Sequence, residues 1–486
     1  MRRRWLPVVF SSLTFLYLFL PLTLAVYTLA PVRARNGVAL AASLLFFAWG
    51  APRFVFLLVA GCLMDYVIGN RLVPGASGEA ARRRWLGLGL AVNLALLLYF
   101  KYANFGMEQL NALRSLAGRA PLAWTHVALP IGISFFTFQK ISYLMDVFRG
   151  TARPAAHFGR YLLYIALFPQ LIAGPIVRYY DVAAQLECRR TDQEDRLAGA
   201  WRLALGLAKK CLLANPLALL ADQAFGAAPG ALGAGAAWAG LYAYALQIYF
   251  DFSGYSDMAI GLGRLMGFRF LENFDFPYIS RGMVEFWRRW HISLGNFMRD
   301  YLYIPLGGNR VAPARRSFNL WLVFLLSGLW HGAAWNFVIW GAWHGFWIVV
   351  EKRLAGRRGA RPRPAALAVP ATFLLVLIGW VFFRAENLAA AGAYFRALAG
   401  LATAPVAPLP MLADLRAATA LILGTGLAFA PLFTRRAPSH DWMVADGTPG
   451  AACRILLRAA ATLALIGLST LPLLLGGFNP FIYFRF

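Results

Sequence analysis

Acidic residues, and charge in general, are scarce in this chain of 486 residues. It has 21 Asp and Glu against 47 Lys and Arg, and only 14% of its residues are charged, whereas an average soluble protein has about 25%. Polar segments that could link soluble domains are missing, and 60% of the residues are hydrophobic. These shortages exclude an ordinary soluble protein and indicate an integral membrane protein. The surplus cations lie between apolar stretches, so we assign them to cytoplasmic loops and expect no nucleic-acid partner.

Cysteine is equally rare, and the four cysteines, Cys62, Cys188, Cys211 and Cys453, lie far apart without a C-x-x-C pair. This pattern predicts neither a zinc site nor a catalytic thiol. The chain starts with three arginines and a long apolar run over 5–30, without a clear signal-peptidase site. We therefore expect a retained first membrane segment and not a cleaved signal peptide.

Long apolar stretches recur from residue 5 to residue 475. Because a bilayer core takes roughly 20 helical residues, they predict an all-α, polytopic membrane protein with about 9 to 12 crossings, in one domain over 1–486. Two stretches do not fit a simple crossing. Pro169 and Pro175 break the stretch 158–177, and 272–310 is rich in aromatics and cations at once, which is typical of interfacial or re-entrant helices.

The apolar stretch 318–350 also departs from a single crossing. As one straight helix it would be about 50 Å long, too long for one upright span and too short for two full ones. The cation runs on either side of it, Arg315-Arg316 and 352–363, both belong in the cytoplasm by the positive-inside rule. The sequence therefore predicts a segment that tilts or turns back, with its break at Gly328 or Gly332.

His331 lies between these two glycines, directly after Trp330. A titratable side chain in an apolar segment is costly, so its default interpretation is functional. The alternative is a packing histidine that is hydrogen-bonded to a neighbouring carbonyl. His344 follows 13 residues later, about 220° around an unbroken helix, so we do not expect it to share a site with His331.

A second cluster lies at 285–294. On one helix, Arg288 would be an i, i+3 neighbour of His291, and Trp287 an i, i+4 neighbour, so that one face would carry a guanidinium, an indole and an imidazole. Such a face suits an anionic acyl donor with phosphates. An interfacial helix with arginines at the headgroups and tryptophans in the aromatic belt explains the same residues, and both interpretations stay open.

A third polar segment lies at 249–257, inside an apolar stretch. It contains Asp251, Ser253 and Asp257, of which the last two are one helical turn apart. A metal ion would need more converging oxygen ligands than this spacing supplies. Buried hydrogen bonding or the wall of a polar tunnel is the preferred interpretation, and no metal site is expected.

Together these motifs identify a family. The chain resembles the membrane-bound O-acyltransferases, and among them the members that acetylate alginate and other exopolysaccharides. The resemblance is dense over about 130–384, which would be the catalytic core. It is carried by the following segments: GISFFTFQ at 132–139, FPQLIAGPI at 168–176, FDFSGYSDMA at 250–259, EFWRRWHISL at 285–294, RDYLYIPLGGN at 299–309, WHG at 330–332 and NPFIYFRF at 479–486.

The resemblance implies an acyl transfer in which His331 is the family's intramembrane histidine and His291 its second polar position. Imidazole can remove a hydroxyl proton near neutral pH, so His331 is the expected base, and an acetyl-histidine intermediate stays open. His291 would orient the donor or stabilise the oxyanion, and Arg288 and Arg289 would lie near the donor's phosphates. The remaining expected substrate contacts are Trp287, Trp330, Asp251 and Ser253.

The resemblance also implies a multi-pass protein of the bacterial inner membrane, in contact with lipid. Its donor would be acetyl-CoA or another acyl thioester, with no tightly bound cofactor, and its acceptor an exported polysaccharide, alginate or similar. Because an acyl-CoA cannot cross a hydrocarbon core, a central tunnel and periplasmic acetyltransferase partners are expected. D-alanyl or other acyl transfer to a cell-wall polymer, a transporter and a scaffold of a secretion complex are the alternatives.

Overall fold

The computed structural model describes residues 9–75, 78–172, 174–228, 230–355, 364–401, 410, 414–434 and 451–476. Three motifs of the sequence lie outside this part: the arginines at 2–4, the cations at 356–363 and the segment 479–486. Helices make up the regular structure of the described residues, which contain no β-strand, and Phe274 and Trp290 form an isolated bridge. The prediction of an all-α fold is confirmed.

Five helical stretches are long and apolar enough to cross a membrane, judged by length and composition over the described residues. Three shorter apolar helices accompany them, at Phe15–Leu29, Leu388–Leu398 and Leu415–Ala428. The polytopic prediction is therefore confirmed, whereas the expected total of crossings and the central tunnel stay predictions. The five long stretches are Pro52–Arg71, Glu79–Leu116, Gln193–Phe225, Ala365–Arg384 and Cys453–Leu474.

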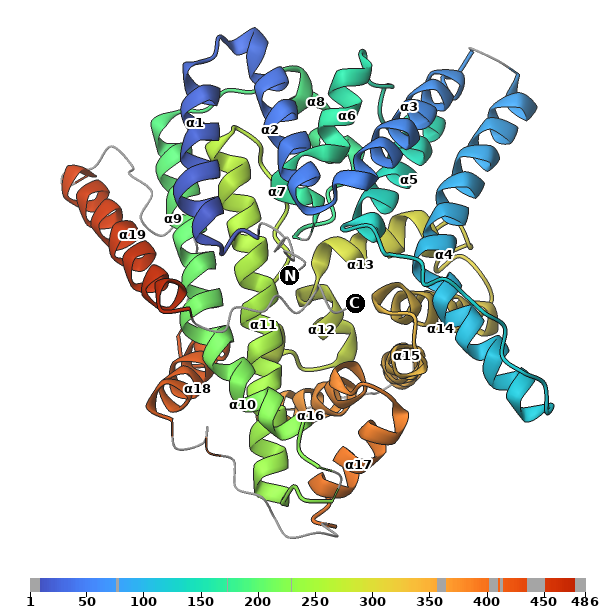
Figure 1. The fold of residues 1–486 in the computed structure, drawn as a ribbon, viewed down its shortest axis with the longest axis vertical. Helices are drawn as coiled ribbons and strands as arrows, with labels where there is room; N and C mark the ends of the chain where they lie inside the picture. Colours follow the sequence, from blue (N-terminus) through green and yellow to red (C-terminus); the bar gives the residue numbers. More distant parts are fainter. Residues whose placement is uncertain are drawn as a thin grey trace. The chain divides into compact units, whose positions relative to one another are not determined.

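The chain forms two compact units, and the prediction of one domain over 1–486 stays a prediction. The first unit comprises 1–192 and 263–270. The stretch 158–177 breaks as predicted, because α6 ends at Ala166 and only the single turn α7 precedes an irregular segment with Pro175. The helices of this unit, from blue to cyan in Figure 1, are α1 (Leu20–Leu29), α2 (Arg35–Gly50), α3 (Val55–Arg71), α4 (Glu79–Leu116), α5 (Ile133–Arg149), α6 (Phe158–Ala166), α7 (Phe168–Leu171) and α8 (Tyr179–Glu187).

The second unit comprises 193–262 and 271–486, and buried ion pairs join its first helices. Lys210 pairs with Asp251 at 2.6 Å, and Asp257 accepts from both Arg202 and Lys209. Its first long elements are α9 (Gln193–Ala208), the π-helical η4 (Lys209–Ala214), α10 (Asn215–Phe225) and α11 (Ala234–Leu265). Three helices close to the C-terminus follow much later in the chain: α17 (Leu388–Leu398), α18 (Leu415–Ala428) and α19 (Ala451–Leu474).

The stretch 318–350 turns back on itself, as predicted. Helix α14 (Pro313–His331) ends where Gly332 adopts an extended conformation, and α15 (Trp335–Ala355) begins after three residues. Gly328 is essential to this hairpin, because a Cβ atom there would collide with the Phe337 carbonyl and lie 3.2 Å from the Gly341 Cα. The prediction of a break at Gly332 is therefore confirmed, and Gly328 allows close packing of the two helices.

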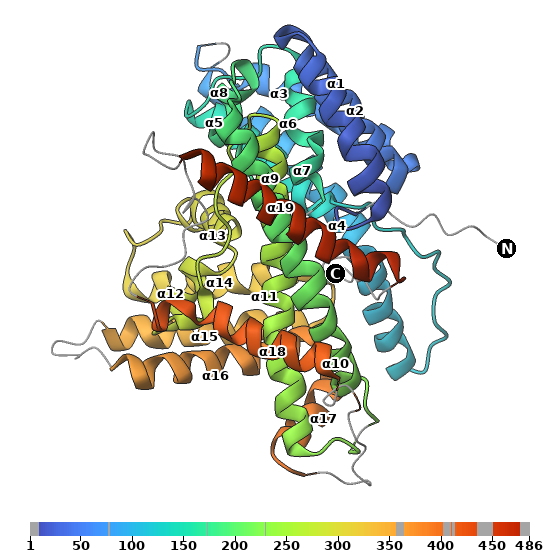
Figure 2. The same cartoon turned by 90° about the vertical axis from the view of Figure 1, so that its left-hand side faces the viewer.

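Helix α16 (Ala365–Arg384) packs antiparallel to α15 (Figure 2). The Trp343 indole donates to the Leu375 carbonyl at 2.8 Å, and the Asn336 amide donates to the Ala385 carbonyl at 2.8 Å. The start of α14, the end of α15 and the start of α16 therefore lie at one end of this helical layer. The hairpin turn and the end of α16 lie at the other.

Candidate active site

His331 is the last residue of α14, and three aromatic rings enclose it. Its ring centroid lies 4.9 Å from that of Trp330, 4.9 Å from that of Trp340 and 5.2 Å from that of Phe383. These rings come from α14, α15 and α16, and they leave only 3% of His331 exposed. The helix break therefore places an imidazole in an enclosed, largely apolar environment.

His291 approaches His331 from a different part of the chain. The two ring centroids are 6.5 Å apart, and His291 is fully buried against Phe252 of α11, at 4.6 Å. Among the histidines that the sequence singled out, the structure thus brings His291 and His331 together. Trp330 joins this group, with its ring 6.2 Å from that of His291.

The expected helical face with Arg288, Trp287 and His291 is wrong. Helix α12 ends at Arg289, and α13 (Ile292–Met298) begins after His291, whose φ of 47° is left-handed. A helix cannot continue through this conformation, which non-glycine residues rarely adopt. The segment 272–310 does not form a single spanning helix, because α12 (Met283–Arg289), α13 and the π-helical η6 (Arg299–Tyr303) are each too short to cross a bilayer. Its interfacial or re-entrant placement stays a prediction.

Asn273, in the loop after α11, holds the segment around His291. Its side-chain oxygen lies 3.1 Å from His291 Nδ1 and 3.2 Å from the Ser293 backbone nitrogen. Its amide nitrogen donates to the hydroxyl of Ser256 on α11 at 3.1 Å. Its backbone carbonyl accepts from the Ile292 nitrogen at 3.0 Å. Through these polar contacts, Asn273 connects the segment around His291 to α11.

His344 lies on the other side of Trp340 from this group. Trp340 contacts both His331 and His344, each with 4.9 Å between ring centroids. His344 Nδ1 accepts from the Trp287 indole at 3.3 Å, and its Nε2 faces Gly379, where a Cβ atom would lie 2.7 Å away. His344 is thus packed between helices, and Trp287 contacts this histidine.

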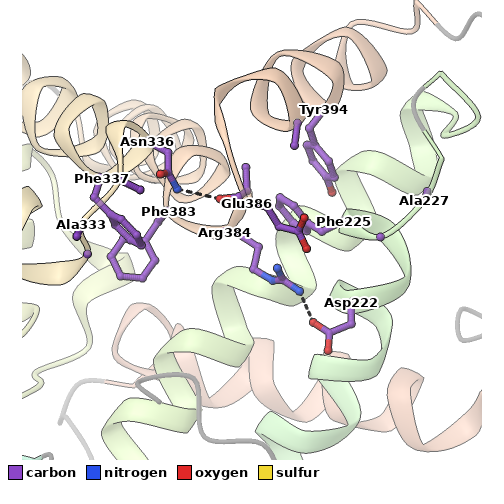
Figure 3. Close-up of a pocket in the computed structure, with 15 residues that line it drawn as sticks. Asp222, Phe225, Ala227, Ala333, Asn336, Phe337, Phe383, Arg384, Glu386 and Tyr394 are labelled. Atoms are coloured by element: carbon purple, nitrogen blue, oxygen red, sulfur yellow. Dashed lines mark hydrogen bonds and ion pairs between the residues drawn. The ribbon is translucent and has the colours of Figure 1, made fainter. Parts of the chain in front are cut away.

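A cavity of about 880 Å³ opens beside His331, at the turn of the hairpin (Figure 3). Gly332 and Phe383 line it, and Phe383 also contacts His331. Figure 3 shows Asn336 and Phe337 on one side of the cavity and residues of α10 on the other, with the ion pair of Arg384 and Asp222 between them. The full lining is Asp222, Phe225, Gly226, Ala227, Gly332, Ala333, Ala334, Asn336, Phe337, Phe383, Arg384, Ala385, Glu386, Ala390 and Tyr394.

The opposite end of the hairpin carries a group of cations. Burial lowers the pKa of Lys352 at the end of α15, and the nearby charges of Arg316 and Arg288 lower it further. Arg288 is exposed at the end of α12. Arg289 differs, because it is paired with Asp275 and Glu285, each at 2.9 Å. Positive charge and cavity therefore lie at opposite ends of the helical layer.

Asp251 and Ser253 do not line the cavity beside His331. Asp251 is 1% exposed and paired with Lys210. Ser253 lines a separate, mostly apolar pocket of about 460 Å³ between α9, α11 and α18, together with Asp257. The buried polar contacts that the sequence suggested for 249–257 are present for Asp251 and Asp257, whereas the Ser253 hydroxyl has no hydrogen-bond partner among the described residues. Within the described residues, no group of three His, Cys, Asp or Glu side chains converges as a metal site would require.

Sequence reasoning missed Asn273, Trp340 and Phe383, which surround the histidine pair. Asn273 precedes His291 by 18 residues and lies in a loop, so no helical or strand period connects them. Trp340 and Phe383 are two of many aromatics in apolar helices, and only the hairpin and its contact with α16 distinguish them. The one available signal was the turn that begins at Gly332, because it brings Trp340 of α15 back towards His331.

Comparisons with known proteins identify the family of this chain. The family model of the membrane-bound O-acyltransferases matches residues 136–382, which include His291, His331 and Asn273, and ends one residue before Phe383. A probable alginate O-acetylase AlgI of Pseudomonas putida is 44% identical over 491 residues, which cover 99% of this chain and 100% of the relative. A peptidoglycan O-acetyltransferase of Helicobacter pylori is 36% identical and covers 81% of this chain and 80% of the relative.

A more distant relative, a teichoic acid D-alanyltransferase of Bacillus subtilis, is 28% identical over 53% of this chain and 69% of the relative. The shared feature of these relatives is transfer of an acyl group, and the matched region of this chain holds its two buried, neighbouring histidines. The chain therefore belongs to the membrane-bound O-acyltransferase family and is a multi-pass membrane acyltransferase.

Proposed function

We propose that this protein moves an acetyl group from a cytoplasmic thioester, acetyl-CoA or another acyl thioester, to an exported polysaccharide such as alginate. The bacterial inner membrane is the proposed location. One observation carries the proposal: two buried histidines meet beside a cavity that opens at the end of the helical layer opposite the cations. The positive-inside rule places the cations in the cytoplasm, so the cavity would face the periplasm. The acetyl group and the polymer are proposed from two relatives, the alginate O-acetylase of Pseudomonas putida and the peptidoglycan O-acetyltransferase of Helicobacter pylori.

In this proposal, His331 is the general base. Its imidazole removes the proton of the acceptor hydroxyl while the oxygen attacks the carbonyl carbon of the thioester. The tetrahedral intermediate then expels the thiolate, which takes up a proton, and the acetyl ester remains on the acceptor. Trp330, Trp340 and Phe383 exclude water around the imidazole, which limits hydrolysis of the thioester.

The donor would approach from the end of the layer that carries the cations. Arg288 is exposed there with Arg316 and Lys352 nearby, and three positive charges suit the phosphates of a coenzyme. Arg289 would contribute mainly by holding α12 on Asp275, since its guanidinium already has two carboxylate partners. His291 would orient the reacting groups from the side of α11.

The acceptor would approach through the cavity at the hairpin turn. The cavity combines polar groups, among them Arg384 and Asn336, with the stacked rings of Phe225 and Tyr394, whose centroids are 4.0 Å apart. Aromatic and polar side chains together suit a hydroxyl-bearing acceptor. A periplasmic acetyltransferase that receives the acetyl group at this end is the proposed partner.

The experiment that tests this route fills the cavity. Ala333→Trp should reduce polymer-bound acetate at least tenfold in a strain that lacks the native gene, while the protein stays in the membrane at normal abundance. Ala389→Trp on α17 is the matched control, because Ala389 is exposed and does not line the cavity. Normal polymer-bound acetate with Ala333→Trp would contradict this route. Polymer-bound D-alanine in place of acetate would show that the transferred group is D-alanyl and not acetyl.

A further inference from the structure

We propose that Asn273 is a positioning residue of this active site, which keeps the proton of His291 on Nδ1 and leaves Nε2 as a hydrogen-bond acceptor. This inference rests on the proposed function, because it concerns one of its two histidines. It goes further by assigning a task to a loop residue that is not among those lining the cavity. The orientation of the Asn273 amide determines the tautomer of His291.

The orientation of the amide follows from a donor that cannot change its role. The backbone nitrogen of Ser293 can only donate, and the Asn273 side-chain atom 3.2 Å away must therefore be the oxygen. The Ser293 hydroxyl, at 2.8 Å, also fits this oxygen. With the amide reversed, two N–H groups would face each other. The amide nitrogen then donates to Ser256, whose hydroxyl is able to accept.

The tautomer of His291 follows from this orientation. Its Nδ1 lies 3.1 Å from the Asn273 oxygen, which has no proton to give, so Nδ1 must carry the hydrogen. A neutral imidazole has only one N–H group. Nε2 therefore has a lone pair, and it is buried without a hydrogen-bond partner among the residues that the structure describes.

Asn273 also holds the backbone on which this geometry depends. His291 has a left-handed φ of 47°. The residue after it is held by the hydrogen bond from the Ile292 nitrogen to the Asn273 carbonyl, at 3.0 Å. The residue before it, Trp290, pairs with Phe274 in the isolated bridge. The same short segment thus fixes the direction of the imidazole and the position of its proton.

This arrangement restricts what His291 can do in the reaction. A neutral imidazole with its proton on Nδ1 cannot donate to an oxyanion through Nε2. It can accept a hydrogen bond there, from a hydroxyl of the acceptor or an N–H group of the donor, beside His331. Of the two tasks expected for His291, orientation of a reactant is the one that this tautomer permits.

Two substitutions separate positioning from simple packing. Asn273→Ala removes the side chain and should lower the acetylation rate per molecule at least tenfold, because a wrong histidine tautomer can cost up to about 10⁴ in rate. Asn273→Asp keeps an oxygen at the same place and should retain activity.

The direct test replaces His291 with Nδ-methylhistidine, a residue whose neutral form can only carry its lone pair on Nε2. In the Asn273→Ala background the methyl group occupies vacated space, and it should restore activity at least fivefold over Asn273→Ala alone. Thiol release from acetyl-CoA would be measured in permeabilised membranes that contain deacetylated alginate, over a range of pH. Asn319→Ala is the matched control, because Asn319 is a buried amide that bonds to the Leu306 carbonyl instead of to a histidine.

The outcomes are distinct. Full activity of Asn273→Ala would overturn the inference, and so would a loss that the methylated histidine does not repair. The same would follow if Asn319→Ala reproduced the loss. In those cases, loss of activity in His291→Ala and His331→Ala would leave the proposed function intact. Full activity in both histidine variants would instead contradict the proposed function itself.

Discussion

Single residues in this protein show that burial alone does not define the active site. His291, His331 and His344 are all at most 3% exposed, and only the first two lie next to each other. His344 is bound by the Trp287 indole and packed against Gly379. The nearest neighbours of each imidazole therefore separate a candidate catalytic histidine from a packing histidine.

The different role of His344 is open to test. His344→Ala leaves the Trp287 indole unpaired and creates a cavity, which should lower the stability by about 2–4 kcal/mol. Thermal unfolding in detergent measures this cost. Acetylation per molecule of folded protein should stay well above that of His331→Ala. Equal losses per molecule in the two variants would mean that both histidines act through packing.

The cysteines provide a second prediction for single residues. Cys62 and Cys211 are buried, Cys188 and Cys453 are exposed, and all four are free and lie outside the histidine site. A variant with alanine at the buried positions and serine at the exposed ones should keep near-normal polymer acetylation. Loss of acetylation at normal membrane abundance would show that a thiol takes part in the reaction.

At the scale of elements, the hairpin of α14 and α15 is the part that determines the position of His331. The sequence predicted its turn because the apolar segment is too long for one crossing and too short for two, contains two glycines, and has cations on both sides. The break before His291 was not predictable in the same way. Met283 to Met298 reads as one helix, and only the pairing of Trp290 with Phe274 shows why the chain leaves the helix there.

Close packing of the hairpin can be tested with two glycines on helices. Gly328→Ala would place a methyl group against the Phe337 carbonyl, so α14 and α15 must separate and His331 must move. We expect a loss of stability of about 2 kcal/mol or more, together with a loss of acetylation. Gly87→Ala on α4 meets no atom within 4 Å and should be neutral or stabilising by up to about 1 kcal/mol. Similar effects of both substitutions on activity would contradict the account of the hairpin.

For the whole molecule, hydropathy and charge predicted the class of fold, and the sequence motifs predicted the family. Hydropathy, charge and motifs are all local properties of the sequence. The contacts that complete the site are not local. The bond of Asn273 to His291 and the contact of Phe383 with His331 join segments that are 18 and 52 residues apart, and only the folded chain brings them together. Arg289 illustrates the same limit, since its partner Asp275 lies 14 residues away.

Sidedness is the prediction at this scale. In the cysteine-free background, a single cysteine at Ala314, next to the cations of α14, should react with a membrane-impermeant thiol reagent only after permeabilisation. A cysteine at Glu386, at the mouth of the cavity, should react in intact cells. Labelling is read by gel shift. Gly359, within the second cation run at 352–363, lies outside the described residues. Labelling of both positions from one side would contradict the opposed donor and acceptor ends.

The central claim is that His331 acts as the base of acyl transfer, and its most direct test is the acetate bound to polymer in a deletion strain that carries His331→Ala. A general base contributes about 10² to 10⁴ in rate, so acetate normalised to membrane protein should fall to about 1% or less. His157→Ala, at an exposed histidine that precedes α6, should leave it unchanged. Near-normal acetate in His331→Ala, at normal abundance, would contradict the account.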